Sequence, residues 1–207
     1  MGNFPGPMCV NQIRKRIVGL ASKGHKWRAS MRWTNEMLTK MQRKLIRPHQ
    51  LLKVWKNFSQ VPGGRVAFSK LLGSVIPYTG SVRPVVVQLE KGSAAVEMAD
   101  HRAVRNHLNS IHALALANLG EFPAGLSLHT AIPQNARAIL TRLEVEYLKK
   151  ARGSLVSKAQ VENTIEHLEA PTSVVMESRI QDSSGDLVAL VKTTWLVSPT
   201  TEGQQKT

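Results

Sequence analysis

The sequence predicts an α+β domain in which an antiparallel sheet wraps around one central helix, preceded by short N-terminal helices. Three observations support this fold class. A β-branched hairpin occupies residues 82–98, a segment that is apolar on nearly all sides follows at 106–126, and three or four alternating strands come after it. A helix without a polar face is usually buried. A hairpin, one buried helix and a run of antiparallel strands form an α+β order.

Charge divides the chain near residue 70. Residues 1–70 contain 15 Lys and Arg against a single acid, Glu36, whereas residues 71–207 contain 13 residues of each sign. The whole net charge of +14 therefore lies in the first third, and the remainder is neutral. We expect a basic, acid-free segment (1–33), short basic helices (34–73), the main domain (74–199) and a polar tail (200–207).

The first 33 residues are rich in Arg and Ser and lack any acid. This composition is typical of a mitochondrial transit peptide, so a mitochondrial location is expected. Trp27 and Trp33 among the cations also suit an anionic membrane or RNA, and the basic region up to residue 70 could contact either. A plain tail is the further alternative. In those cases the protein would be cytoplasmic or bound at a membrane surface.

Composition also excludes several classes of protein. Cys9 is the single cysteine, which rules out an internal disulfide and a cysteine-based zinc site. His101, His107 and His112 do not have the spacing of a metal-binding pair on one helical face. Nowhere does an apolar run reach the length of a membrane-spanning helix.

Capping and breaking residues delimit the N-terminal helices. Thr34 can cap a helix that runs toward Ile46, and Pro48 can open a second one. Pro62-Gly63-Gly64 is a break. A third helix is predicted over Arg65–Leu72, with Val66, Phe68, Leu71 and Leu72 facing the domain and Gly73 as its stop.

The remaining segments alternate with period two and predict strands. A turn at Lys91-Gly92 separates the two arms of the hairpin, Val82–Glu90 and Ala94–Met98. In Ala138–Lys149, apolar Ile139, Leu143, Val145 and Tyr147 alternate with charged side chains, so Tyr147 is expected in the core. The last three strands are predicted at Ser154–Val161, Ser173–Gln181 and Leu187–Val197.

A motif spans the start of the predicted central helix. Asn106 is followed by Asn109 three residues on, by His112-Ala113-Leu114 at six to eight, and by Glu121 at fifteen. Over roughly residues 60–198 the chain resembles the hotdog-fold thioesterase superfamily, and its phenylacetyl-CoA thioesterase-like branch in particular. That branch has Asn, Gly, His-Gly-Gly and an acid at these positions. Here Asn109 replaces the first Gly, and Ala113 and Leu114 replace the Gly pair.

The resemblance implies an acyl-CoA thioesterase that needs no cofactor and takes a coenzyme A thioester as substrate. Glu121 would be the general base or nucleophile. The backbone N–H groups of Ala113 and Leu114 would hold the oxyanion at a helix N-terminus. His112 and Asn106 would orient the thioester and the loop.

Helical geometry adds a requirement for a second subunit. His112 and Glu121 are nine residues apart, which is roughly 13 Å along a helix and about half a turn out of phase. One helix cannot direct both at one thioester. A site shared across a dimer interface is therefore expected, as the hotdog family is described to build it, in a homodimer or a dimer of dimers.

Other interpretations stay open at this point. Glu121 could be a solvated surface acid, and His112 could only cap the helix. Lys149, Lys150 and Arg152 could bind the phosphates of coenzyme A or form a solvated turn. The rival to an enzyme is a non-catalytic hotdog dimer that binds an acyl group or docks on a larger assembly. Loss of the Gly pair favours this rival, and retention of the acid favours the enzyme.

Overall fold

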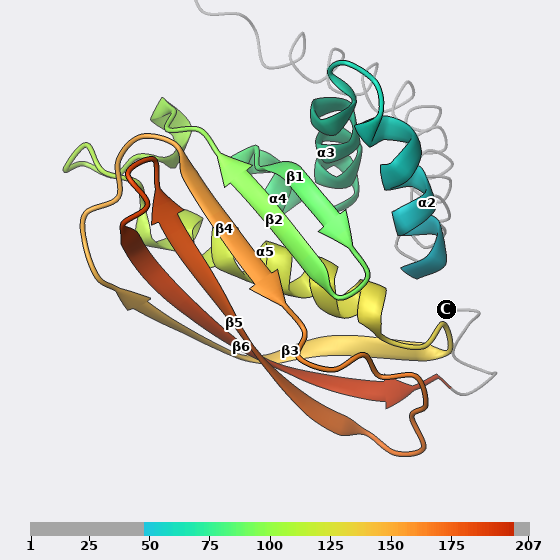
Figure 1. The fold of residues 1–207 in the computed structure, drawn as a ribbon. Coiled ribbons are helices and arrows are strands. Elements are labelled where there is room, and N and C mark those ends of the chain that lie inside the picture. Colours follow the sequence, from blue (N-terminus) through green and yellow to red (C-terminus); the bar gives the residue numbers. More distant parts are fainter. Residues whose placement is uncertain (1–47, 201–207) are drawn as a thin grey trace, which may run out of the picture. The chain divides into compact units, whose positions relative to one another are not determined.

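The computed structural model describes residues 48–200, which lie within one compact unit (Figure 1). The predicted helix over 34–46, the basic segment 1–33 and the polar tail beyond Thr200 lie outside the described residues. The helices are α2 (Pro48–Ser59), α3 (Gly64–Val75), α4 (Pro77–Val82) and α5 (Ala113–Ala131), with a 3₁₀ turn at Arg102–Val104. The strands are β1 (Val85–Glu90), β2 (Ser93–Met98), β3 (Ala136–Tyr147), β4 (Leu155–Gln160), β5 (Thr172–Asp182) and β6 (Leu187–Pro199).

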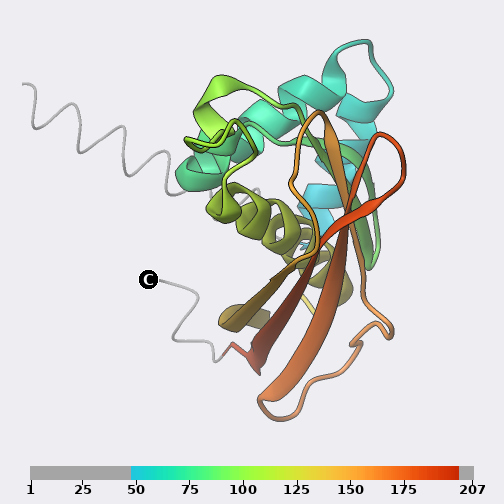
Figure 2. The same cartoon turned by 90° about the vertical axis from the view of Figure 1, so that its left-hand side faces the viewer.

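Six strands form one sheet in the order β1-β2-β4-β5-β6-β3, and every neighbouring pair is antiparallel. Helix α5 lies along the inner side of this curved sheet (Figure 2). At Gly120 the helix comes so close that an added Cβ would lie 2.3 Å from the side chain of Val191. The predicted α+β architecture, with a sheet around one central helix, is confirmed.

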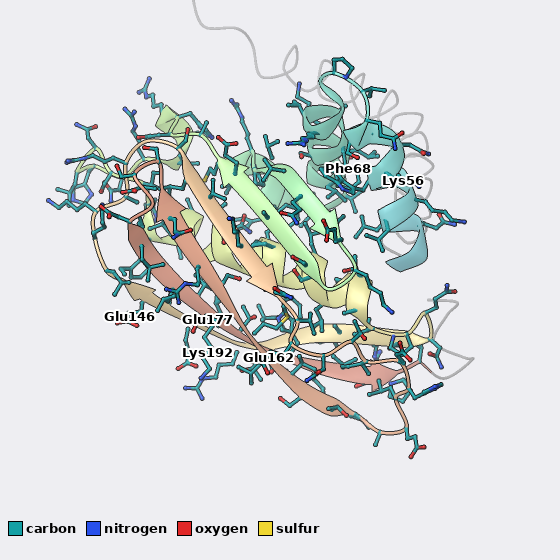
Figure 3. All side chains as sticks on the ribbon, viewed as in Figure 1. Lys56, Phe68, Glu146, Glu162, Glu177 and Lys192 are labelled. Atoms are coloured by element: carbon teal, nitrogen blue, oxygen red, sulfur yellow. The ribbon has the colours of Figure 1, made fainter. Side chains whose placement is uncertain are left out.

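The N-terminal helices pack on the same core as the sheet. Leu51 and Trp55 of α2 and Phe68 and Leu72 of α3 are buried in the cluster that contains Leu119 of α5. Figure 3 shows Phe68 in this layer, and it shows the charged Glu146, Glu177 and Lys192 on the strands. Helix α3 runs on to Val75, so the stop predicted at Gly73 was wrong and the predicted domain boundary at 73/74 falls inside a helix. Val66 is exposed rather than buried.

The predicted first residues of the first strand and of the central helix were also wrong. The first strand begins at Val85, because Val82 ends α4 and Arg83 follows it in the left-handed region with φ 57°. The central helix begins at Ala113 instead of Asn106 and continues to Ala131. Residues 106–111 form a polar loop, in which side-chain acceptors replace helical hydrogen bonds.

Strand β3 differs from its predicted pattern at one point. The register with β6 shifts between Leu140 and Arg142, which marks a β-bulge. Leu143 and Tyr147 are paired with the buried Thr193 and Ala189 and so share the inner face. Ile139, on the other side of the bulge, is paired with the outward-facing Leu196 and is exposed. Its predicted place beside Leu143 was wrong because the bulge exchanges the two faces.

Candidate active site

The loop before α5 is organised by Asn106. Its Oδ1 accepts hydrogen bonds from the backbone N–H of Leu108 at 2.9 Å and of Ser110 at 3.2 Å, and from the Ser110 hydroxyl at 3.2 Å. Asn109 has φ 54°, a left-handed conformation that Gly and Asn tolerate best. The exchange of Gly for Asn109 therefore preserves the backbone of the loop. Asn106 therefore supports the loop through these three hydrogen bonds.

His112 caps the N-terminus of α5. Its Nδ1 accepts a hydrogen bond from the backbone N–H of Leu114 at 3.1 Å. An imidazole nitrogen that accepts carries no proton, so in this arrangement the ring hydrogen lies on Nε2. The ring is exposed to solvent. An outward Nε2–H is therefore available as a donor at the start of the helix.

The backbone of Ala113 and Leu114 lies in the first turn of α5. The carbonyl of His112 accepts from the N–H groups of Ala115 at 2.9 Å and Leu116 at 3.1 Å, and the Leu114 N–H is bonded to His112 Nδ1. For the Ala113 N–H no acceptor is found among residues 48–200. Neither Ala113 nor Leu114 has a positive φ, so the lost Gly pair leaves no backbone strain. The predicted pair of oxyanion donors is reduced to one open N–H while His112 caps the helix.

Tyr147 joins β3 to the same turn. Its hydroxyl donates to the carbonyl oxygen of Ala113 at 3.1 Å, and its side chain is 48% exposed. Its predicted place in the core was wrong. Period-two alternation placed Tyr147 on the inner face correctly, but β3 is the edge strand of the sheet, and the inner face at that edge is only partly covered.

Glu121 lies two turns farther along α5, where it is half-buried. Burial raises the pKa of its carboxyl. In the part of the chain that the structure describes, no hydrogen-bond or ion-pair partner is found for this carboxylate. A carboxylate that is desolvated and unpaired is costly for folding, and such groups gather at functional sites. The interpretation of Glu121 as a solvated surface acid was wrong.

The Glu121 side chain lines a cavity of about 170 Å³. Its walls come from the N-terminal helices, from α5 and from β6, and they are mostly apolar. The lining residues are Leu51, Leu72, Ile76, Thr79, Glu121, Phe122, Gly125, Leu126, His129 and Trp195. His129 was not predicted, although it follows Glu121 and Gly125 at a spacing of four residues, which is one face of a helix. Burial lowers the pKa of His129.

His112 and Glu121 do not meet within one chain. His112 caps the exposed first turn of α5, whereas Glu121 faces a cavity that His112 does not line. This agrees with the half-turn offset between the two residues in the sequence.

The three cations after β3 are not equivalent. The Nζ of Lys149 lies 2.7 Å from carboxylate oxygens of both Asp182 and Asp186, and these hydrogen bonds raise the pKa of the Lys149 ammonium. Its charge is thus balanced inside the turn. Lys150 and Arg152 are exposed, and no acidic partner is found for either among the described residues.

Two features are absent from residues 48–200. Nowhere in this range do three His, Cys, Asp or Glu side chains converge on one point. None of the helices described combines the length and apolar composition that crossing a membrane requires.

Comparison with known proteins defines the family. Residues 64–197 match a domain of unknown function, DUF4442, which is more than half of the 207 residues. The chain belongs to the DUF4442 family. A crystal structure named genomics APC5556 is 30% identical to this DUF4442 protein, with a TM-score of 0.62 over 72% of this chain and 97% of that chain.

Solved structures also show the fold of this DUF4442 protein. PA5026 from Pseudomonas aeruginosa, described as a probable thioesterase, is 20% identical, with a TM-score of 0.59 over 67% of this chain and 97% of that chain. A mutant of the thioesterase SAV0944 from Staphylococcus aureus is 16% identical, with a TM-score of 0.52 over 59% and 99%. The DUF4442 chain therefore has the hotdog fold, as predicted. No curated protein matches it.

Proposed function

We propose that this protein hydrolyses a coenzyme A thioester at a site shared by two subunits, with Glu121 as the general base. The observation that carries this proposal is the half-buried, unpaired carboxylate of Glu121 on the wall of an apolar cavity. A raised pKa brings a carboxylate nearer to the basicity that is useful for activating water at neutral pH.

The proposed reaction uses one water molecule, the Glu121 carboxylate and two N–H donors. The Glu121 carboxylate removes a proton from water, and the resulting hydroxide forms a bond to the thioester carbon. Nε2–H of His112 and N–H of Ala113, both from the second subunit, donate to the oxyanion. When the carbonyl re-forms, the C–S bond breaks and the coenzyme A sulfur accepts the proton from Glu121. The products are a carboxylic acid and free coenzyme A.

Support for a homodimer comes from the edge of the sheet. Strand β3 has 12 residues and is paired on one side only, with β6. Exposed apolar side chains lie on this strand and just after it: Leu143 (41%), Tyr147 (48%) and Leu148 (45%). Long uncovered edges and apolar patches of this kind mark association surfaces. We propose that a second copy binds there, alone or in a dimer of dimers, and that it is the subunit from which the shared site takes its first turn of α5.

The proposed substrate carries phosphates, and Lys150 and Arg152 are suitable partners for them. We do not propose this role for Lys149, because the carboxylates of Asp182 and Asp186 already balance its charge. For residues 1–33 we propose mitochondrial targeting, with contact to RNA or an anionic membrane as the alternative role of the basic region.

A second candidate function is a non-catalytic hotdog dimer that binds an acyl group or docks on a larger assembly. Two observations favour it. The Leu114 N–H is bonded to His112 and cannot bind an oxyanion at the same time. Ala113 and Leu114 also carry side chains where the related branch has a Gly pair. The two functions differ in what happens to a bound thioester.

A panel of coenzyme A thioesters assayed with wild type and Glu121→Gln decides between them. Glu121→Gln keeps the shape of the side chain and removes the base, so we expect turnover to fall by roughly 10²–10⁴ while binding is retained. Glu177→Gln is the matched control, because Glu177 is exposed on the interior strand β5, where it forms an ion pair with Arg179, away from the β3 edge. Hydrolysis that Glu121→Gln leaves intact would exclude the mechanism. Binding without any hydrolysis by the wild type would support the non-catalytic function.

A further inference from the structure

The N-terminal helices build one wall of the Glu121 cavity. Leu51 of α2 and Leu72 of α3 are buried and line it, together with Ile76 between α3 and α4. Phe122 and Leu126 of α5 form the opposite wall. Without Leu51, Leu72 and Ile76 the cavity would be open to solvent on this side.

The polar groups of the cavity are few, and one of them is already engaged. The Thr79 hydroxyl accepts a hydrogen bond from the Asn118 side-chain amide at 3.0 Å. The other polar groups of the lining residues are the unpaired Glu121 carboxylate, the half-buried His129 ring and the indole N–H of Trp195, which has no partner among the described residues. A pocket whose lining is mostly apolar accepts apolar ligands. The lining thus suits a hydrocarbon group that is attached to a reacting carbon near Glu121.

Size limits what this group can be. The cavity measures about 170 Å³, and an apolar cavity of about 150 Å³ in a protein holds one benzene molecule. A ring of six carbons, or a short branched chain of similar volume, therefore fits. A chain of about sixteen carbons has more than twice as many carbon atoms and would extend beyond the pocket.

We propose that this cavity binds the acyl group of the thioester and that helices α2–α4 restrict it to compact groups, namely single rings and short or branched chains. The inference rests on the proposed thioester hydrolysis, since it assigns the substrate class of that site. Leu72 and Gly125 are then the residues that set the size limit, because Leu72 forms the wall and Gly125 leaves space beside Glu121.

The first experiment measures binding to full-length Glu121→Gln, in which turnover is suppressed. The probes are free coenzyme A and its butyryl, hexanoyl, benzoyl and palmitoyl thioesters, titrated by calorimetry. Each buried methylene should strengthen binding about fourfold up to hexanoyl or benzoyl, and palmitoyl-CoA should bind no more tightly than hexanoyl-CoA. Affinity that keeps rising to palmitoyl, or that does not depend on the acyl group, would overturn the inference.

Variants of the wall provide a second, independent test. Leu72→Ala enlarges the cavity and should move the preferred acyl group to a longer chain, by about two methylene groups. Leu71→Ala is the matched control, because it removes the same atoms from the neighbouring residue, which does not line the cavity. In Gly125→Ala the new Cβ would lie 3.4 Å from Trp195 and 3.6 Å from Glu121 Oε1, so this variant should fold and favour a smaller acyl group.

The outcomes separate this inference from the proposed function. If Glu121→Gln abolishes hydrolysis but neither Leu72→Ala nor Gly125→Ala shifts the acyl preference, the hydrolase stands and the acyl cavity is wrong. If the preference shifts while Glu121→Gln remains active, the cavity stands and the role of Glu121 as base is wrong. Because the two substitutions change the cavity in opposite directions, a loss of folding in Leu72→Ala alone still leaves the Gly125→Ala result to decide.

Discussion

The Tyr147 hydroxyl donates a hydrogen bond of 3.1 Å to the Ala113 carbonyl and so ties the edge strand β3 to the first turn of α5. This turn carries His112 and the open N–H of Ala113, whereas Glu121 lies two turns away in a separate cavity. The proposed chemistry therefore depends on a second subunit that covers the β3 edge. Five predictions test the parts of this arrangement.

The first prediction concerns pH. Because burial raises the pKa of Glu121, the folded protein holds this proton more tightly than the unfolded chain. The stability that this provides is present at low pH and is lost as pH rises from the ordinary carboxyl pKa through the raised one. In that window wild type should lose stability relative to Glu121→Gln, and kcat/KM should increase. Urea unfolding of both proteins across this range checks it, and a stability difference that is independent of pH would contradict it.

The second prediction separates capping from catalysis at His112. His112→Ala removes the cap and should cost about 0.5–2 kcal/mol of unfolding free energy. Asn is a good N-cap, so His112→Asn should retain most of the stability but lack the Nε2–H donor. Both variants should lose turnover, by about 10²-fold, and less than Glu121→Gln does. Full activity in His112→Asn would show that His112 acts only as a helix cap and not in catalysis.

The third prediction concerns Leu114, whose side chain is 60% exposed. Leu114→Ala creates no internal cavity and should change the unfolding free energy by less than about 0.5 kcal/mol. The variant keeps the backbone N–H that His112 caps and the open N–H of Ala113, so turnover should fall far less than in Glu121→Gln. Thermal unfolding and steady-state kinetics of the two variants measure this, and a Leu114→Ala loss as large as that of Glu121→Gln would contradict it.

The fourth prediction tests the dimer. Full-length protein should sediment as a dimer or tetramer at micromolar concentration. Leu143→Glu places a charge on the exposed inner face at the β3 edge and should shift sedimentation toward the monomer, with loss of turnover. Val175→Glu is the matched control, because Val175 is 55% exposed on β5 and lies away from that edge. A monomeric wild type with full activity would exclude the shared site.

The fifth prediction concerns the N-terminal segment. Fusion of residues 1–33 to a fluorescent reporter should deliver the reporter to mitochondria. Replacing the Arg and Lys residues of this segment by Gln provides the control and should abolish delivery. A diffuse signal from the unchanged fusion would rule out targeting. Binding to RNA and to anionic vesicles across a range of salt concentrations would then test the alternatives, since phosphate contacts weaken steeply as salt rises.

Much of the fold could be predicted because it depends on local periodicity. The strands β4, β5 and β6 were placed within two residues of their observed bounds, since each alternates between faces. The start of α5 was missed by seven residues, because small polar residues such as Ser110 are compatible with a loop as well as with a helix. The bulge in β3 was invisible, because nothing in the composition of that strand distinguishes it from a regular one.

The candidate site was predicted only in part, because it depends on tertiary contacts between distant parts of the sequence. Asn106, His112 and Glu121 occur in a recognisable spacing, so the motif located them. The cavity is formed by residues more than 100 positions apart, such as Leu72 and Trp195, and no local pattern brings them together. Similarly, the pairing of Lys149 with Asp182 and Asp186 depends on β3 and the β5–β6 turn meeting in space.

The strand order has a consequence for how the protein is made. β6 is the last strand to leave the ribosome, yet it lies between β5 and β3 and supplies Val191 and Trp195, against which Gly120 and Gly125 pack. Until it emerges, β3 lacks the strand with which it pairs in the sheet, and α5 lacks its contacts with β6. Pairings of such long sequence separation form slowly, and unpaired edges are prone to aggregate. The domain should therefore complete its folding only after β6 has emerged, and nascent chains that stop before residue 187 should require a chaperone to remain in solution.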